Sequence, residues 1–362
     1  MEIPQDSTAE KARRRAEIKK WKAIVAEHQK PHLGRALWQV VNTFGSYLAV
    51  WVLIWFLQGT WWATLPLAML AGALTVRMFI IFHDCGHGSF FKSRTANTVV
   101  GWFCGLFTWT PYGYWSSEHA QHHAASGDLD RRGVGDIWTL TVQEYIESSR
   151  WKRFAYRLAR NPFILFVVAP IFLFTIWYRF PAVGSKPKEK RSVWLMNVAL
   201  FFFVLGMGWI FGFGQYLILQ LVAMAAAGSS GVWLFYVQHQ FEDVYWERGE
   251  NWDFTAAALQ GSSFYKLPRV LQWFSGNIGY HHIHHLCPSI PNYNLERCHH
   301  SDPLFHEVPA ITLFTSLKSF TYRLWDESSR KLVGYRRMNE IRREKRDRET
   351  AAGNASKGDM GA

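Results

Sequence analysis

The sequence has few cysteines and no motif that would bind a redox cofactor. Its four cysteines, Cys85, Cys104, Cys287 and Cys298, show neither CxxC nor zinc-ribbon spacing. We therefore expect reduced thiols, in or near a reducing cytosol, rather than a disulfide framework. No P-loop, GxGxxG motif or iron–sulfur pattern occurs. The chain thus has no fingerprint for a nucleotide, a flavin or a nicotinamide.

Charged residues are absent from two long stretches. None occurs between Arg35 and Arg77, and none between Arg191 and Glu242. Each stretch is long enough for two membrane-spanning helices of about 20 residues joined by a short turn. The mean hydropathy of −0.09 stays unremarkable only because the basic, polar ends of the chain dilute these stretches. This distribution argues against one large soluble core and indicates a polytopic membrane protein.

We predict four membrane-spanning helices in two hairpins. Their expected ranges are Val41 to Leu57, Ala63 to Phe82, Trp194 to Phe211 and Tyr216 to Val237. Two further apolar segments, Thr98 to Trp109 and Pro162 to Tyr178, are interpreted as re-entrant or interfacial, because the first is short and the second has basic residues on both flanks. The expected fold class is an all-α integral membrane protein with a cytosolic histidine-rich cap.

The ends of the chain carry much of the formal net charge of +12. Ala9 to Lys30 lacks the apolar core of a signal peptide, and we interpret it as a solvated or membrane-surface helix rather than a nucleic-acid arm. The tail from about Thr350 has the composition of a disordered segment. We therefore divide the chain into a cytosolic basic N-terminal helix (1–34), a membrane domain (35–310) and a cytosolic C-terminal helix with a disordered tail (311–362).

Histidines are the abundant feature, and many of them fall into three tight clusters near the ends of the apolar stretches. The spacing in each cluster, i, i+4 or i, i+3, i+4, places the imidazoles on one face of a helix. Imidazole binds iron, copper or zinc, and this number of ligands suggests two metal ions. The candidate ligands are His83, His87, His119, His122, His123, His281, His284 and His285, with His239 as a ninth.

The remaining histidines have ordinary interpretations. His282 lies about 100° from the face that its cluster shares, so it is left out of the ligand set. Isolated or surface positions account for the other five, His28, His32, His299, His300 and His306. Asn277 could hold a metal-bound water, and Arg77 is expected to snorkel toward the membrane face. Candidate acceptors for the ligand imidazoles, or simply surface carboxylates, are Asp84, Glu118, Asp128, Glu242 and Asp243.

The three clusters, HxxxH, HxxHH and HxxHH, resemble the histidine boxes of integral-membrane fatty acid desaturases. The surrounding sequence sharpens the resemblance to acyl-lipid enzymes of the Δ12 (omega-6) type over approximately residues 35 to 310. The segments that carry it are His83 to Phe91, Gly135 to Thr139, Gln238 to Asp243 and His284 to Leu295.

This resemblance implies an O2-dependent desaturase that introduces a cis double bond, at Δ12, into a lipid-linked or thioester-linked acyl chain. It implies two non-haem Fe ions held mainly by histidine, and electrons from a separate carrier. A basic cytosolic face would suit an acidic donor, ferredoxin or cytochrome b5. No nucleic-acid partner is expected, and the expected location is the bacterial inner membrane with the active site facing the cytosol.

Two alternatives remain open. A carotenoid ketolase or hydroxylase would use the same three boxes and the same metal chemistry on a different hydrophobic substrate. A zinc-dependent membrane hydrolase or a metal carrier would use the histidines without redox chemistry.

Overall fold

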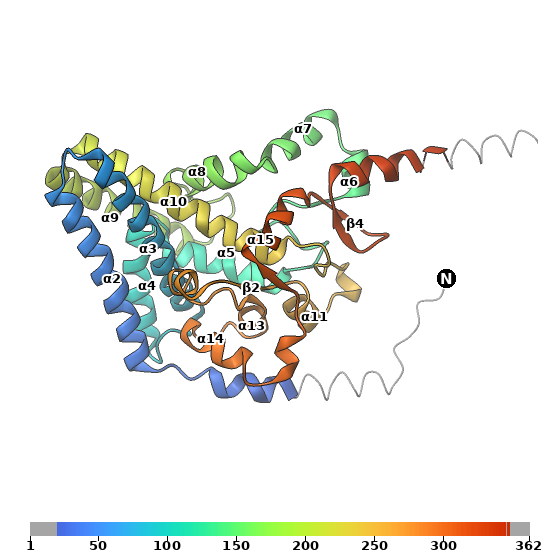
Figure 1. Cartoon of the computed structure of the whole chain (residues 1–362), viewed down its shortest axis with the longest axis horizontal. Coiled ribbons are helices and arrows are strands. Elements are labelled where there is room, and N and C mark those ends of the chain that lie inside the picture. The colour runs from blue at the N-terminus through green and yellow to red at the C-terminus, as the bar shows by residue number, and fades with distance from the viewer. Residues whose placement is uncertain (1–19, 345, 348–362) are drawn as a thin grey trace, which may run out of the picture.

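A computed structural model describes residues 20–344 and 346–347. Four of its helices are long and apolar enough to cross a membrane. These are α2 (Leu33–Phe56), α3 (Trp61–His87), α9 (Pro187–Phe211) and α10 (Phe213–His239). The short turns within the α2–α3 and α9–α10 hairpins lie at the same end of the bundle (Figure 1). The predicted all-α membrane fold with four long helices in two hairpins is confirmed.

The helices extend beyond their predicted limits at the histidine-bearing ends. Helix α3 continues past Phe82 through His87 and ends at Gly88, whose left-handed backbone (φ 70°) closes the last turn. Helix α10 continues to His239. Hydropathy predicts only the apolar part of a helix that faces lipid. The helix itself can continue through polar residues, because a polar side chain does not interrupt the backbone hydrogen bonds. The first cluster and His239 therefore belong to the final turns of spanning helices.

Helices α3 and α10 pack closely against each other. A Cβ on Gly72 of α3 would lie 2.5 Å from the carbonyl oxygen of Ala223 and 2.7 Å from the Cβ of Ala226, both on α10. Small residues at such a crossing let two helix backbones approach, the usual basis of helix association in membranes. This contact brings together the two helices that carry His83, His87 and His239.

The two shorter apolar segments also form helices. Helix α4 (Arg94–Phe107) has 14 residues, about 21 Å at the α-helical rise, and is too short to cross a bilayer core of about 30 Å. The second segment comprises η1 (Ile164–Val168), α8 (Ala169–Thr175) and η2 (Trp177–Arg179). Together with α7 (Arg150–Ala159) it makes an element bent by 61°. That bend fits a re-entrant segment or a broken span, so the re-entrant assignment stays a prediction.

Short elements cover the histidine-bearing end of the bundle. The helical ones are α5 (Tyr112–Ala125), α6 (Val142–Glu147), η3 (Gly249–Asn251), α11 (Phe254–Leu259), α12 (Arg269–Phe274), α13 (His281–Leu286), α14 (Asn292–His299), η4 (Pro303–His306), α15 (Leu313–Ser316) and η5 (Leu317–Thr321). Further helical turns occupy residues 20–28 and 335–344.

Two small sheets, which the sequence did not predict, connect distant parts of this cap. Strand β4 (Leu324–Asp326) lies between β1 (Leu140–Thr141), to which it is parallel, and β5 (Lys331–Val333), to which it is antiparallel. Strand β2 (Phe264–Lys266) pairs in parallel with β3 (Ala310–Thr312). Both sheets cross the predicted boundary between residues 310 and 311, which stays untested. Most of the predicted N-terminal helix and the tail from Thr350 lie outside the described residues.

Arg77 differs from its sequence interpretation. A snorkelling side chain would reach water, whereas the Arg77 side chain is buried (7% exposed). Its Nε donates to Thr43 Oγ1 at 3.1 Å, its Nη1 donates to the carbonyl oxygen of Trp273, and the guanidinium lies over the Trp273 ring. Arg77 therefore ties α12 to α2 and α3, a contact between residues too far apart in sequence for hydropathy to reveal.

Candidate metal centre

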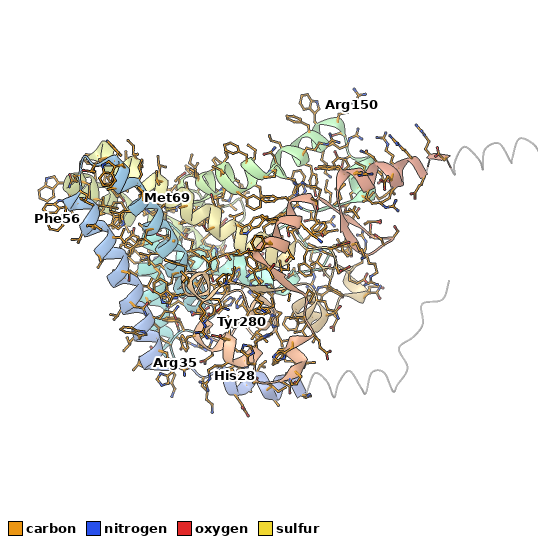
Figure 2. The ribbon with its side chains drawn as sticks, in the orientation of Figure 1. His28, Arg35, Phe56, Met69, Arg150 and Tyr280 are labelled. Atoms are coloured by element: carbon orange, nitrogen blue, oxygen red, sulfur yellow. The ribbon has the colours of Figure 1, made fainter. Side chains whose placement is uncertain are left out.

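Four helices bring all nine candidate ligands to one place. His83 and His87 come from the end of α3, His119, His122 and His123 from α5, His239 from the end of α10, and His281, His284 and His285 from α13. Figure 1 shows α5 and α13 in the middle of the molecule, beside the inner ends of the long helices, and Figure 2 marks Tyr280, the residue before α13. Helix α13 is short, with six residues.

Five of the histidines form the first group. The ligand nitrogens of His83, His87, His119, His123 and His284 all lie within 4.8 Å of one another. Nε2 of His284 is 3.0 Å from Nε2 of His83 and 2.9 Å from Nε2 of His123, which in turn is 3.1 Å from Nε2 of His119. One imidazole from α13 thus connects the α3 and α5 clusters.

A second group lies beside the first. His122, His239 and His285 have ligand nitrogens within 4.8 Å of one another, and all three residues are buried. His281 adjoins this group, because its Nε2 is 2.9 Å from Nε2 of His239. Adjacent histidines in one box, His122 with His123 and His284 with His285, therefore belong to different groups.

The nitrogen positions fit metal ions better than hydrogen bonds. Two nitrogens bound to one ion at about 2.1 Å lie about 3.0 to 3.4 Å apart when the angle at the ion is 90° to 109°. An imidazole nitrogen has either one hydrogen or one lone pair. The contacts described above link four nitrogens in a row, with three contacts between them. At most two of these three contacts can therefore be hydrogen bonds. Among the described residues, Nε2 of His87, His122 and His285 is buried without any partner.

Burial also sets the protonation of the imidazoles outside the spanning helices. It holds the pKa values of His119, His123, His281, His284 and His285 well below the usual 6.5, and the neighbouring imidazoles lower them further. These side chains are consequently neutral at pH 7, which is the form of imidazole that binds a metal.

Two buried carboxylates fix ligand rings, one in each group. Asp84 Oδ1 lies 2.9 Å from Nδ1 of His83, and its Oδ2 accepts from the backbone N and the Nδ2 of Asn292. Asp136 Oδ1 lies 2.6 Å from Nδ1 of His122. A carboxylate at Nδ1 places the hydrogen there and leaves Nε2 free to bind a metal. On His239 the carbonyl oxygen of Gly261, 3.2 Å from Nδ1, occupies the same position.

Of these two carboxylates, the sequence indicated only Asp84. Asp136 lies in the loop after α5, and its separation from His122 has no helical spacing, so the only available sign was its position in a segment that resembles the family. The other candidate acceptors contact different groups. Glu118 contacts Tyr114, Asp128 pairs with Arg131, and Glu242 and Asp243 both pair with Lys331.

The histidines excluded from the ligand set lie outside both groups. His282 is fully buried and turns away from the centre, with its Nε2 3.1 Å from Nδ1 of His299. His299, His300 and His306 form a separate cluster at the end of α14 and in η4. His32 caps the N-terminus of α2, and His28 lies on the preceding helical turn. Asn277 occupies the turn before α13 with φ 60°, and its proposed contact with a metal-bound water stays untested.

A small cavity adjoins the second group. Its volume is about 10 Å³, and its lining includes Asp136, Phe235 and His239. A cavity of this size holds about one water molecule. It leaves space beside the His239 imidazole for one water-sized molecule, and none for an acyl chain.

Comparison with known proteins identifies the family. Residues 59–310, well over half of the chain and including all nine histidines, match the model of the fatty acid desaturase family. The chain belongs to this family. It is therefore an oxidoreductase, and its histidine groups, its apolar helices and its lack of a redox-cofactor motif fit that class.

The relatives cover most of the desaturase. A fatty acid desaturase of Bacillus subtilis (strain 168) is 47% identical over 319 residues, which is 88% of this chain and 90% of the relative. Two Synechocystis enzymes are more distant. An sn-1 acyl-lipid omega-3 desaturase (ferredoxin) is 29% identical over an alignment that covers 69% of this chain and 68% of the relative. An sn-1 oleoyl-lipid 12-desaturase is 25% identical over an alignment that covers 66% of this chain and 68% of the relative.

Proposed function

We propose that this desaturase introduces a cis double bond at Δ12 into a lipid-linked or thioester-linked acyl chain with a histidine-held pair of iron ions. The single observation that carries the proposal is the pair of adjacent histidine groups. The first ion would be bound by His83, His87, His119, His123 and His284. The second would be bound by His122, His239, His285 and the adjoining His281.

The overall reaction requires a redox metal and an external donor. Converting –CH2–CH2– into –CH=CH– removes two hydrogens, and O2, two electrons and two protons then yield two molecules of water. Bound iron would supply the O2 chemistry that attacks an unactivated methylene, which zinc, having no redox chemistry, cannot supply. The sequence has no nucleotide, flavin or iron–sulfur motif, and we propose that the electrons come from a separate carrier, ferredoxin or cytochrome b5.

The protein's own residues position this chemistry. Asp84 and Asp136 hold the His83 and His122 rings with Nε2 directed inward. Burial separates the centre from bulk water and keeps the imidazoles of α13 neutral. Two of the four helices that supply the ligands, α3 and α10, belong to the apolar bundle, so the centre adjoins the bilayer from which an acyl chain would enter.

The orientation of the enzyme follows from the charges at the helix ends. Basic residues flank the histidine-bearing ends, and positive charge favours the cytoplasmic side. We propose a location in the bacterial inner membrane with the centre facing the cytosol. Reporter fusions should place the 186–191 segment and both termini inside, and an external 186–191 segment would contradict this topology.

Product analysis tests the activity. A host that lacks polyunsaturated lipids should accumulate a diene when it expresses the chain together with a ferredoxin, and derivatisation then locates the bond. The His122→Ala chain should leave the profile unchanged. An oxygenated carotenoid without any diene would favour the alternative, a carotenoid ketolase or hydroxylase.

A further inference from the structure

A pocket that contains no residue of the histidine boxes is lined by arginines. It lies between α6, α7 and the helix over residues 335–344, and its volume is about 300 Å³. Arg150, Arg153 and Arg157 of α7 line one side, and Arg342 lines the other. None of the nine candidate metal ligands takes part. Figure 2 shows Arg150 at the periphery of the molecule, and α7 runs along that edge in Figure 1.

No described carboxylate neutralises the positive charge of this pocket. The lining contains no acidic residue. Within the described part of the chain, no ion pair joins any of the four arginines to a carboxylate, although Arg157 Nε donates to the hydroxyl of Tyr145 at 2.5 Å. Four guanidinium groups around one concave surface repel one another, and a bound anion would relieve that repulsion.

The same helix has an apolar face that is exposed. Trp151, Phe154 and Leu158 are 81%, 60% and 47% exposed and follow one another at i, i+3, i+7. The arginines repeat with the same spacing one position earlier, which places them about 100° around the helix. Large apolar side chains on one face and basic side chains beside them are the features of a helix that lies in a membrane interface.

The position of α7 along the chain supports this placement. It is the first half of the bent element whose second half, Ile164–Arg179, is apolar. The 61° bend turns α7 away from that half. Helix α7, before the bend, is amphipathic, and the segment after the bend is apolar. This order fits a chain that lies on the bilayer surface as α7 and then enters the membrane. The arginines then lie at the level of lipid headgroups.

We propose that this arginine pocket binds the phosphate of an anionic phospholipid. Guanidinium groups donate paired hydrogen bonds to phosphate oxygens, and 300 Å³ is at the lower end of the range for ligand pockets. Phe154 belongs to both the pocket lining and the exposed face. A lipid whose headgroup occupies the pocket can therefore extend its acyl chains past Phe154 into the bilayer. An acidic carrier protein would instead leave Trp151 and Phe154 in contact with water.

Lipid titration of the purified full chain tests the proposal. In uncharged detergent, binding of short-chain phosphatidylglycerol, phosphatidylcholine and inorganic phosphate is measured by native mass spectrometry. Phosphatidylglycerol should bind most tightly. The Arg150→Gln/Arg153→Gln variant should bind it about 10- to 30-fold more weakly. This factor follows from the loss of two basic side chains, each of which contributes roughly 1 kcal/mol near an anionic surface. The matched control, Lys188→Gln/Lys190→Gln, removes the same charge from exposed positions at the start of α9.

Four outcomes would overturn the proposal. Equal losses in the two variants would indicate general charge attraction without a pocket. Equal binding of phosphatidylcholine and phosphatidylglycerol would remove the preference for an anionic headgroup. Phosphate binding as tight as phosphatidylglycerol would assign the pocket to the free anion. Retention of an acidic ferredoxin that is lost only in the arginine variant, with lipid binding unaffected, would assign it to a carrier protein. Both variants should unfold at the temperature of the unmodified protein, because the substituted side chains lie at the surface.

Discussion

Two histidine clusters lie on opposite sides of α13 and differ in their surroundings. On one side are the nine candidate ligands, most of them buried, with nitrogens about 3 Å apart in four pairs. On the other side are His299, His300 and His306, of which the last two are exposed. The first cluster has buried carboxylates on two of its rings, whereas no described carboxylate forms an ion pair with a ring of the second.

From this comparison we predict that clustering of histidines alone does not make a metal centre. Burial keeps imidazoles neutral, and a carboxylate or carbonyl on Nδ1 fixes the nitrogen that faces the ion. His300 and His306 are exposed to solvent, so ordering their side chains around an ion would cost side-chain entropy. Three substitutions test this distinction.

The largest effect is expected from His122→Ala. This substitution removes a buried candidate ligand of the second group, so turnover should fall below detection and the iron content of the purified protein should decrease, while membrane insertion is retained. The matched control is His306→Ala in the exposed cluster, where activity and iron content should stay nearly unchanged. An active His122→Ala enzyme with full iron would remove the distinction between the clusters.

An intermediate effect is expected from Asp136→Asn. The amide cannot hold the hydrogen on Nδ1 of His122 as the carboxylate does, and loss of such a contact reduces metal affinity or activity about 10- to 100-fold. Iron retention during chelator titration measures the change. Asp243→Asn, which removes an exposed carboxylate paired with Lys331, is the control. If both variants retained iron equally, the Asp136 contact would have no role in the centre.

The smallest effect is expected from the pH dependence of His299. Burial, together with His300 and His306, lowers the pKa of His299 to about 4. Between pH 6.5 and 4 the unfolded chain therefore binds a proton that the folded chain does not, so the contribution of His299 to stability falls as the pH decreases through this window. His299→Gln should reduce the loss of unfolding temperature between pH 7 and 5 by about 2–4 °C.

The exposed His306→Gln is the control for this measurement. The pH-dependent loss of unfolding temperature should change much less in this variant than in His299→Gln, because burial, the largest cause of the lowered His299 pKa, is left in place and only the smaller contribution of His306 is removed. An unaltered pH profile in His299→Gln would show that His299 protonates without resistance from its surroundings and belongs with the exposed residues.

The helices and the boxes could be predicted because they depend on neighbours in sequence. Hydropathy indicated four spans, and the i, i+3 and i, i+4 spacing selected eight histidines and excluded His282, which the structure turns toward His299. The contact of Asp136 with His122, the contacts of Arg77 and the strands were not predicted, and the reason is the same for all three. In each case the partner is not a neighbour along one helix, so helical spacing gives no sign of it. Trp273 lies 196 residues after Arg77, and β1 pairs with a strand near the end of the chain.

The apolar runs and the helical periodicity of the histidines are enough to predict a membrane protein with three histidine boxes, since both act over a few turns of one helix. The division of the boxes into two groups, with adjacent histidines in different groups, is visible only in the folded chain. That arrangement depends on the close approach of α3 and α10 at Gly72 and on the placement of α13 against α5. The arginine pocket likewise exists only where the C-terminal helix packs beside α7, because residues from distant segments become neighbours only when the chain folds.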